Sequence, residues 1–221
     1  MEIWETTDMK SVRPDLKFKI MRTDFAKLFK NMGYSFFENG LYNLNIIGIR
    51  SDNKNKVTNK YDDVLVLIYN NGNGKQKIMY PITTEPGLYY MTTELGNAKG
   101  TAILVPGQYK GCWAIGKHNG KYKALVQVKP VKVYRDKNKD KVYDMNPKTV
   151  DNGVFGINIH RSNENWTRDT VDMYSAGCQV FANPNYFKSF ISICEKQAGL
   201  YGNSFTYTLI NEKDLDFGQT V

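Results

Sequence analysis

The stretch Val64-Leu-Val-Leu-Ile-Tyr-Asn-Asn-Gly-Asn-Gly-Lys-Gln-Lys-Ile-Met-Tyr-Pro-Ile82 contains two runs of strand-forming residues on either side of an Asn- and Gly-rich turn. A turn of this composition between two apolar runs is a strong signal for a β-hairpin. Outward from it, Gly, Asn and Pro separate further short apolar runs at residues 44–49, 102–105, 124–134 and 204–210. Regularly spaced short strands of this kind predict a sheet-rich domain.

Helices are predicted at two places. Positions 25, 28, 29 and 32 are apolar and have the i, i+3, i+4, i+7 spacing of an amphipathic helix, with Thr23 as its cap and Gly33 as its end. A second helix is predicted at residues 184–196, with Asn183 as its cap. The predicted fold class is therefore α+β, mainly β with a few helices.

The chain has 221 residues, the size of one globular domain, and no internal repeat or long linker divides it. We expect an N-terminal helical or extended segment of residues 1–39 packed on a domain of residues 40–221. No apolar run approaches the roughly 20 residues needed to cross a bilayer, and the first residues do not resemble a secretory signal. We therefore expect a protein made in the cytoplasm that does not insert into membranes. Three cysteines do not make a disulfide framework, so at least one thiol should be free.

Basic residues exceed acidic ones by eight, and residues 117–141 carry +7 of this net charge. Several of these lysines alternate with apolar residues, which favours the solvent-facing side of a sheet over a dedicated anion-binding patch. No aromatic RNA-binding strand, paired Cys/His spacing or basic heptad helix accompanies the charge. A nucleic-acid partner is therefore disfavoured.

A histidine and a cysteine lie in a pattern that suggests chemistry. His160 ends a run of alternating apolar residues, and after fourteen further residues Ser175-Ala-Gly-Cys178 follows. A thiol attacks carbonyl carbon as the thiolate, and an imidazole can take its proton. Gly177 leaves room for backbone N–H groups to face a developing oxyanion. The pattern predicts a cysteine acyl-transfer site, with a structural histidine and a packing cysteine as the alternative.

The order His, fourteen residues, Ser/Thr, any residue, Gly, Cys resembles the active-site signature of the L,D-transpeptidase (YkuD-like) family, especially its stand-alone lysin-type relatives in phages and bacteria. The resemblance is strongest over residues 153–180 and extends weakly over residues 40–211. It implies a β-sandwich catalytic domain with a helix after the cysteine, and no metal or organic cofactor. Ala176 and Val180 depart from the pattern, because the family usually has His at the first position and often Arg or Asn at the second.

The resemblance implies a role for each residue of the motif. Cys178 would be the nucleophile and His160 the general base. Gly177 and the Cys178 amide would stabilise the oxyanion, and Ser175 would brace the loop.

Other residues could contact the substrate. Arg161 follows the base and could replace the polar group missing at Val180, or it could form only a surface salt bridge. Trp166 lies in the segment between base and nucleophile, where a mobile loop would cover the site. Tyr174 and Trp113 could line the substrate groove.

The remaining reactive side chains have simpler interpretations. Cys112 and Cys194 are expected to be packing residues, and His118 is expected to lie in a turn. Residues 136–144 contain the alternating Asp and Asn oxygens of a calcium loop, but the glycine and the bidentate Glu of an EF-hand are missing. An Asp/Asn-rich turn is therefore favoured over a bound cation.

The function predicted from this resemblance is hydrolysis of peptidoglycan stem peptides by a monomeric cysteine enzyme. It would reach the cell wall after phage lysis or as virion cargo. One alternative is a transpeptidase that forms cross-links. Another is a catalytically silent wall-binding or virion structural protein.

Overall fold

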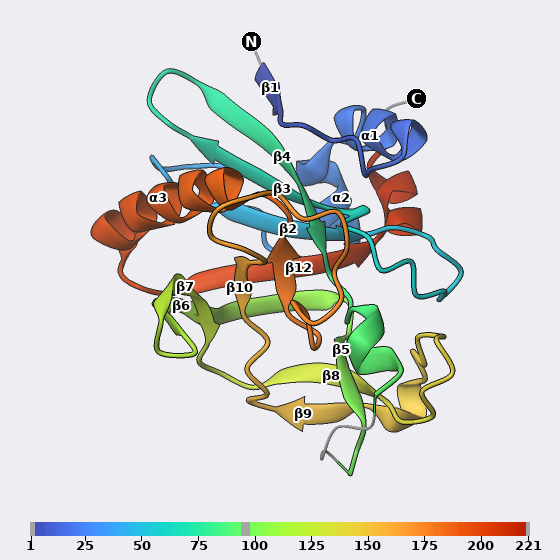
Figure 1. Cartoon of the computed structure of the whole chain (residues 1–221). Coiled ribbons are helices and arrows are strands. Elements are labelled where there is room, and N and C mark those ends of the chain that lie inside the picture. Colours follow the sequence, from blue (N-terminus) through green and yellow to red (C-terminus); the bar gives the residue numbers. More distant parts are fainter. Residues whose placement is uncertain (1–2, 94–97, 220–221) are drawn as a thin grey trace.

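The computed structural model describes residues 3–93 and 98–219, and within them the strands form two sheets (Figure 1). The larger sheet has nine strands in the order β1-β4-β11-β10-β7-β6-β12-β2-β3. Because β3 also pairs with β4, this sheet closes on itself and encloses a core. The smaller sheet has the order β5-β8-β9. The fold is therefore mainly β with added helices, as the sequence predicts.

The boundaries of the elements are as follows. The large sheet contains β1 (Ile3–Thr6), β2 (Asn45–Arg50), β3 (Asp63–Asn70), β4 (Lys75–Thr83), β6 (Gly107–His118), β7 (Tyr122–Gln127), β10 (Ile159–Arg161), β11 (Gln179–Phe181) and β12 (Phe205–Asn211). The small sheet contains β5 (Thr101–Leu104), β8 (Val131–Asp136) and β9 (Asp151–Gly153). The helices are α1 (Pro14–Met21), α2 (Phe25–Asn31) and α3 (Pro184–Tyr201), with 3₁₀ turns η1 (Leu88–Met91), η2 (Pro147–Thr149) and η3 (Glu212–Gly218).

The hairpin predicted from the Asn- and Gly-rich turn is confirmed. Strands β3 and β4 are antiparallel, with Asn70 opposite Lys75. Leu65 and Leu67 of β3 belong to the core that the closed sheet surrounds, whereas Val64 and Val66 face a second cluster under α1 and α2. Both faces of β3 are buried, which is why its sequence is a continuous apolar run without polar alternation.

The N-terminal residues are part of this arrangement. Strand β1 pairs in parallel with β4, and Leu16 of α1 and Leu28 of α2 are fully buried in the second cluster. Figure 1 shows both helices on the outer side of the sheet, close to the C-terminus.

The first predicted helix is correct in place but wrong in its cap. Asp24 caps α2, and its side chain accepts a hydrogen bond from the Lys27 amide at 3.0 Å. The Thr23 hydroxyl instead donates to the Lys19 carbonyl at 2.8 Å and so belongs to the end of α1. Gly33 follows α2 with a φ of +70°, as expected of a helix stop.

The helix after the cysteine is α3, and its predicted cap is confirmed. The Asn183 side chain accepts from the amides of Asn185 and Tyr186. The helix continues through Gly199 to Tyr201, five residues beyond the predicted end, and stops at Gly202, whose φ is +87°.

The predicted strand at residues 124–134 is wrong, because the chain forms two strands there. Strand β7 ends at Gln127 in the large sheet, and β8 begins at Val131 in the small one. Pro130 lies between them and has no N–H to continue the ladder. Strand β6, which pairs with β7, was not predicted, because its glycines and lysines interrupt the apolar pattern.

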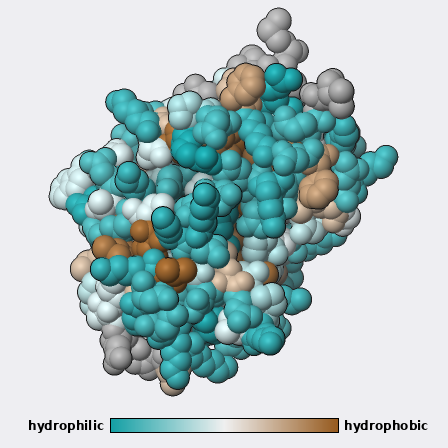
Figure 2. All heavy atoms as spheres, turned by 90° about the vertical axis from the view of Figure 1, so that its right-hand side faces the viewer, coloured by the Kyte–Doolittle hydropathy of each residue, from teal (hydrophilic) through white to brown (hydrophobic). Residues whose placement is uncertain are grey.

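Most of the surface in view is polar. Figure 2 shows a mainly hydrophilic face with small hydrophobic patches. Seven of the nine basic residues of the 117–141 segment are exposed, as expected for the solvent side of strands. Arg135 and Lys139 are the half-buried exceptions.

No helix in the described part of the chain is long and apolar enough to cross a membrane.

Candidate active site

Parallel pairing of two short strands brings the histidine and cysteine segments together. In the register of β10 and β11, Ile159 lies opposite Gln179 and His160 opposite Val180. Cys178 directly precedes β11 and lies beside Asn158, whose amide N is 3.4 Å from Sγ. Side chains two residues apart on a strand share a face, so Asn158 and His160 point to the same side of the sheet. Because Cys178 lies beside Asn158, His160 is on the same side as Cys178, one step farther along the strands. The fourteen-residue spacing is therefore the loop between neighbouring strands.

The Cys178 thiol is protonated at rest. Its Sγ lies 3.3 Å from the Gly156 carbonyl and donates a hydrogen bond to it. Burial of the thiol raises its pKa to about 11, and the Asn158 amide opposes this rise only weakly. Cys178 therefore needs a base to become a nucleophile at neutral pH.

His160 is buried, and the contacts of its Nδ1 determine its tautomer. Its Nδ1 lies 2.8 Å from the Arg161 carbonyl and 3.2 Å from the Tyr122 hydroxyl. A carbonyl can only accept, so Nδ1 carries the proton and Nε2 keeps its lone pair. Burial, together with the nearby His118, lowers the pKa of His160 to about 3. The resting pair is thus a neutral thiol and a neutral imidazole.

His118 does not lie in a turn as predicted. It is the last residue of β6, and its ring stacks on that of His160 with 3.9 Å between centroids. The side-chain amide of Asn158 lies 3.1 Å from its Nδ1. Asn119 and Gly120, both with positive φ, form the turn after it. Asn-Gly is the strongest hairpin signal, and it could have placed His118 at a strand end.

The loop before the cysteine is held in one shape. Ser175 is fully buried, and its Oγ accepts from the Gly177 amide at 3.2 Å and donates to the Cys178 carbonyl at 2.9 Å. Gly177 has a φ of +117°, and a Cβ there would lie 2.2 Å from the Ala102 carbonyl oxygen. These contacts are those that a bracing role for Ser175 requires.

The Gly177 amide, for which an oxyanion role is expected, is engaged within the loop. Its N–H donates to the Ser175 hydroxyl at 3.2 Å. The Cys178 amide is left as the backbone donor for an oxyanion, and Gly177 serves the shape of the loop. The buried Gln179, which sequence reasoning missed, supports this shape by donating to the Gly177 carbonyl at 3.3 Å and accepting from the Tyr207 hydroxyl at 2.8 Å.

The three predicted substrate-binding residues differ in their contacts and in their exposure to solvent. The Arg161 guanidinium stacks over the Tyr122 ring at 4.2 Å and pairs with Glu164 at 3.1 Å. Trp166 is 56% exposed. Tyr174 packs against a small buried apolar cluster that includes Val180, and Cys178 packs against the same cluster.

Trp113 was wrongly expected in the substrate groove. Its ring is fully buried, and its indole N–H donates to the Ile157 carbonyl at 2.7 Å. It belongs to the core inside the closed sheet.

A pocket of about 420 Å³ adjoins the cysteine loop, and we call it the cationic pocket. Its walls are Tyr90, Gly100, Thr101, Ala102, Arg135, Lys139, Val154, Phe155 and Ala176. Arg135 stacks on Phe155 at 4.5 Å and is paired with Asp151 at 3.1 Å. The Lys139 Nζ instead donates to neutral oxygens, the Tyr90 carbonyl at 2.8 Å and the Thr101 hydroxyl at 2.7 Å. The pocket therefore places the positive charge of Lys139 in the same cavity as Ala176, which lies two residues before Cys178.

The Asp- and Asn-rich segment is an internally bonded turn. The Asn138 side chain donates to the carboxylates of Asp140 and Asp144 at 3.1 and 3.0 Å, and the Asp144 amide donates to Asp136. Among residues 3–93 and 98–219, no group of three His, Cys, Asp or Glu side chains is arranged to hold a metal ion.

The other two cysteines are packing residues, as expected. Cys112 and Cys194 are buried, and all three thiols are free. Burial raises the pKa of both thiols, that of Cys194 strongly.

Comparison of the chain with family models, curated proteins and solved structures returned no match.

Proposed function

We propose that this protein is an L,D-transpeptidase-like cysteine enzyme that hydrolyses peptidoglycan stem peptides, acting on the wall after lysis or as virion cargo. The observation that carries the proposal is the pairing of β10 with β11. It puts Cys178 and a buried His160 with a free Nε2 on one side of adjacent strands. The resemblance of residues 160–178 to the L,D-transpeptidase signature supports the proposed family and substrate class.

The chemistry follows from the resting protonation states. His160 Nε2 takes the thiol proton as Sγ attacks the substrate carbonyl carbon, and the Cys178 amide faces the resulting oxyanion. The tetrahedral intermediate collapses by breaking the C–N bond, and the imidazolium returns the proton to the leaving amine. Water, deprotonated by His160, then hydrolyses the thioester. An amine from a second peptide in place of water would give the cross-linking alternative.

The cationic pocket supports a peptide substrate that carries a carboxylate. Its Lys139 charge faces neutral oxygens, and its Ala176 wall belongs to the loop of the nucleophile. A substrate carboxylate would gain a charge-assisted hydrogen bond there while its scissile bond lies near Sγ.

Mass spectrometry of muropeptides tests the proposal. Purified sacculi are incubated with the wild-type protein, with Cys178→Ala and with Cys112→Ala as the matched control. We expect new fragments with the wild type and the control, and none with Cys178→Ala. Incorporation of an added D-amino acid would identify the transpeptidase reaction instead.

The orientation of the thiol favours a second candidate, the catalytically silent wall-binding or virion protein. In this structure Sγ donates to the Gly156 carbonyl, so the proton is not shared with His160. Alkylation separates the two candidates. An active site requires Cys178 to react at neutral pH much faster than Cys112 and Cys194, and to lose this advantage in His160→Ala. Equal, slow labelling of the three thiols, with unchanged muropeptides, would favour the silent protein.

A further inference from the structure

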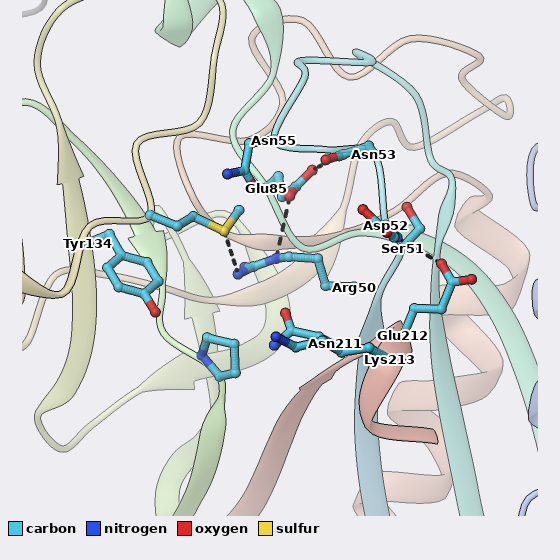
Figure 3. A pocket seen from close by; sticks show the side chains of 12 residues that line it. Arg50, Ser51, Asp52, Asn53, Asn55, Glu85, Tyr134, Asn211, Glu212 and Lys213 are labelled. Atoms are coloured by element: carbon cyan, nitrogen blue, oxygen red, sulfur yellow. Dashed lines mark hydrogen bonds and ion pairs between the residues drawn. The ribbon is translucent and has the colours of Figure 1, made fainter. Parts of the chain in front are cut away.

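A second pocket, of about 360 Å³, lies at the end of β2 and contains no residue of the Cys178 loop (Figure 3). We call it the Arg50 pocket. Its lining residues are Arg50, Ser51, Asp52, Asn53, Asn55, Glu85, Pro106, Tyr134, Met145, Asn211, Glu212 and Lys213. Figure 3 shows the Arg50 side chain between Glu85 and Asn211, with Tyr134 beyond its guanidinium end.

The Arg50 guanidinium has spare donors toward this pocket. The side chain is only 3% exposed. Its Nε and Nη2 donate to the hydroxyl and carbonyl of Thr84 at 3.0 Å, and Nη2 also donates to the Leu104 carbonyl at 3.1 Å. Its Nη1 contacts the Met145 sulfur at 3.7 Å, and a thioether is a weak acceptor. Nε and Nη2 thus donate to protein oxygens, whereas Nη1 has only a weak sulfur acceptor and could donate to a better one on a ligand.

Two buried oxygens on the same wall are also unsatisfied. Within the described residues, Ser51 Oγ and Glu85 Oε1 have no hydrogen-bond partner, and the nearest cation to Oε1 is Arg50 Nε at 3.5 Å. The other Glu85 oxygen accepts from the Asn53 side chain at 2.9 Å. A buried polar group without a partner is costly and calls for an explanation. Two such atoms beside the free edge of a buried arginine indicate a polar ligand.

The charges around the pocket favour a neutral ligand. Burial and the nearby Asp63 raise the pKa of Glu85 well above its ordinary value, which favours the neutral form of this carboxyl, although Arg50 opposes the shift. Among the other lining residues, the two basic side chains of Arg50 and Lys213 balance the two acidic ones of Asp52 and Glu212, so the lining carries no excess charge that would select a simple ion. A neutral Glu85 carboxyl, Ser51 and the amides of the lining asparagines all bond neutral oxygens well.

The remaining walls are apolar and suit a ring. Tyr134, Pro106 and Met145 also line the pocket, and Figure 3 shows Tyr134 on the side away from Ser51 and Asp52. The negative face of an aromatic ring attracts the C–H groups of a saturated ring. The volume is at the lower end of the range of small-molecule pockets, about 300–1,000 Å³, so one ring fits better than a chain of rings.

We propose that the Arg50 pocket binds one neutral sugar ring, with its hydroxyl or acetamido oxygens on Arg50, Ser51 and Glu85 and its C–H face on Tyr134. This goes beyond the proposed peptidase activity and does not depend on it, because no residue of the pocket takes part in the chemistry at Cys178. If both hold, the protein would contact a wall polymer through its sugar and its peptide.

The test is a saturation-transfer NMR titration of the whole protein with methyl β-glucoside and N-acetylglucosamine, and with acetate as the anionic probe. We expect one of the sugars to bind with a dissociation constant on the order of 1 mM, a value ordinary for so small a ligand, and acetate not to compete. Ser51→Ala should weaken the binding about fivefold through loss of one hydrogen bond, and Tyr134→Leu should weaken it further. Ser35→Ala, outside the pocket, is the matched control and should bind like the wild type.

Folding is checked in the same samples. Ser51→Ala removes a hydroxyl that has no partner among the described residues, so the melting temperature of the variant should not fall. Cys178→Ala should retain full sugar binding, which separates this proposal from the enzyme. The proposal is overturned if neither sugar shows saturation transfer, if Ser51→Ala and Tyr134→Leu bind as well as Ser35→Ala, or if acetate displaces the sugar.

Discussion

The rings of His118 and His160 stack with their centroids 3.9 Å apart and an angle of 20° between their planes. The two imidazoles come from β6 and β10, and the two histidines are 42 residues apart in the chain. Two cationic imidazoles at this distance would repel each other, so the pair is stable only when at least one ring is neutral. The stack therefore adds to the effect of burial, which lowers the pKa of His160, and it fixes the plane of the ring.

Replacing His118 should raise the pKa of His160. His118→Phe keeps an aromatic ring in the stack but removes the possible positive charge. Burial remains the main cause of the low pKa, so we expect a rise of less than about one unit. Because the chain has two histidines, the variant has a single imidazole, and its proton NMR signal reports His160 directly. An unchanged or lower pKa would show that His118 exerts no electrostatic effect on the base.

Acid should destabilise the protein through His160. Its pKa is about 3 when folded and near 6.5 when unfolded, so the unfolded state binds more protons between these values. The contribution of His160 to the free energy of unfolding should therefore be largest above pH 6.5 and fall toward pH 3, by roughly 4 kcal/mol. Urea unfolding at several pH values measures this slope.

His160→Gln is the control for that slope, because it has no group that titrates there. Asp62, whose pKa burial raises to about 6, contributes in the opposite direction, since its stabilisation is lost as pH rises. The difference between wild type and variant removes this common contribution. Equal slopes in the two proteins would contradict a buried neutral His160.

Gly177→Ala should disrupt the cysteine loop. The added Cβ would meet the Ala102 carbonyl at 2.2 Å, and the φ of +117° is unfavourable for alanine. We expect a loss of about 2–4 kcal/mol in the free energy of unfolding, together with loss of the selective reactivity of Cys178. Gly199→Ala is the matched control, because it lies in α3 with no atom within 4 Å of the new Cβ, and it should stabilise by about 1 kcal/mol. Similar effects of the two substitutions would rule out a special conformation at Gly177.

Lys139→Met should weaken the binding of substrates that carry a carboxylate. The change removes the positive charge that faces Tyr90 and Thr101 in the cationic pocket. We expect KM for an acidic stem peptide to rise about tenfold while kcat changes by less than about twofold. Lys137→Met, at an exposed position of the same segment, is the control. A fall in kcat with an unchanged KM, or the same effect on an amidated peptide, would contradict a binding role.

Much of the fold follows from short-range signals in the sequence. The Asn- and Gly-rich turn predicts the β3–β4 hairpin, and Asn183 followed by Pro184 predicts the start of α3, because the residues that form a turn or cap lie next to each other in the chain. The same argument fails at residues 124–134, where Pro130 separates strands that join different sheets. Strand β6 was missed because its partner strands, and not its own pattern, hold it in the sheet.

For the candidate site, too, some features follow from the sequence and others only from the tertiary structure. The sequence alone determined the order and spacing of His160, Ser175 and Cys178, and hence the hypothesis of a cysteine acyl-transfer site. Only the tertiary structure decided that His118 stacks on the base, that the Gly177 amide is engaged by Ser175, and that Arg50 is buried with a free edge. Burial and contact depend on residues far apart in the chain that the closed sheet brings together, and no local pattern records those distances.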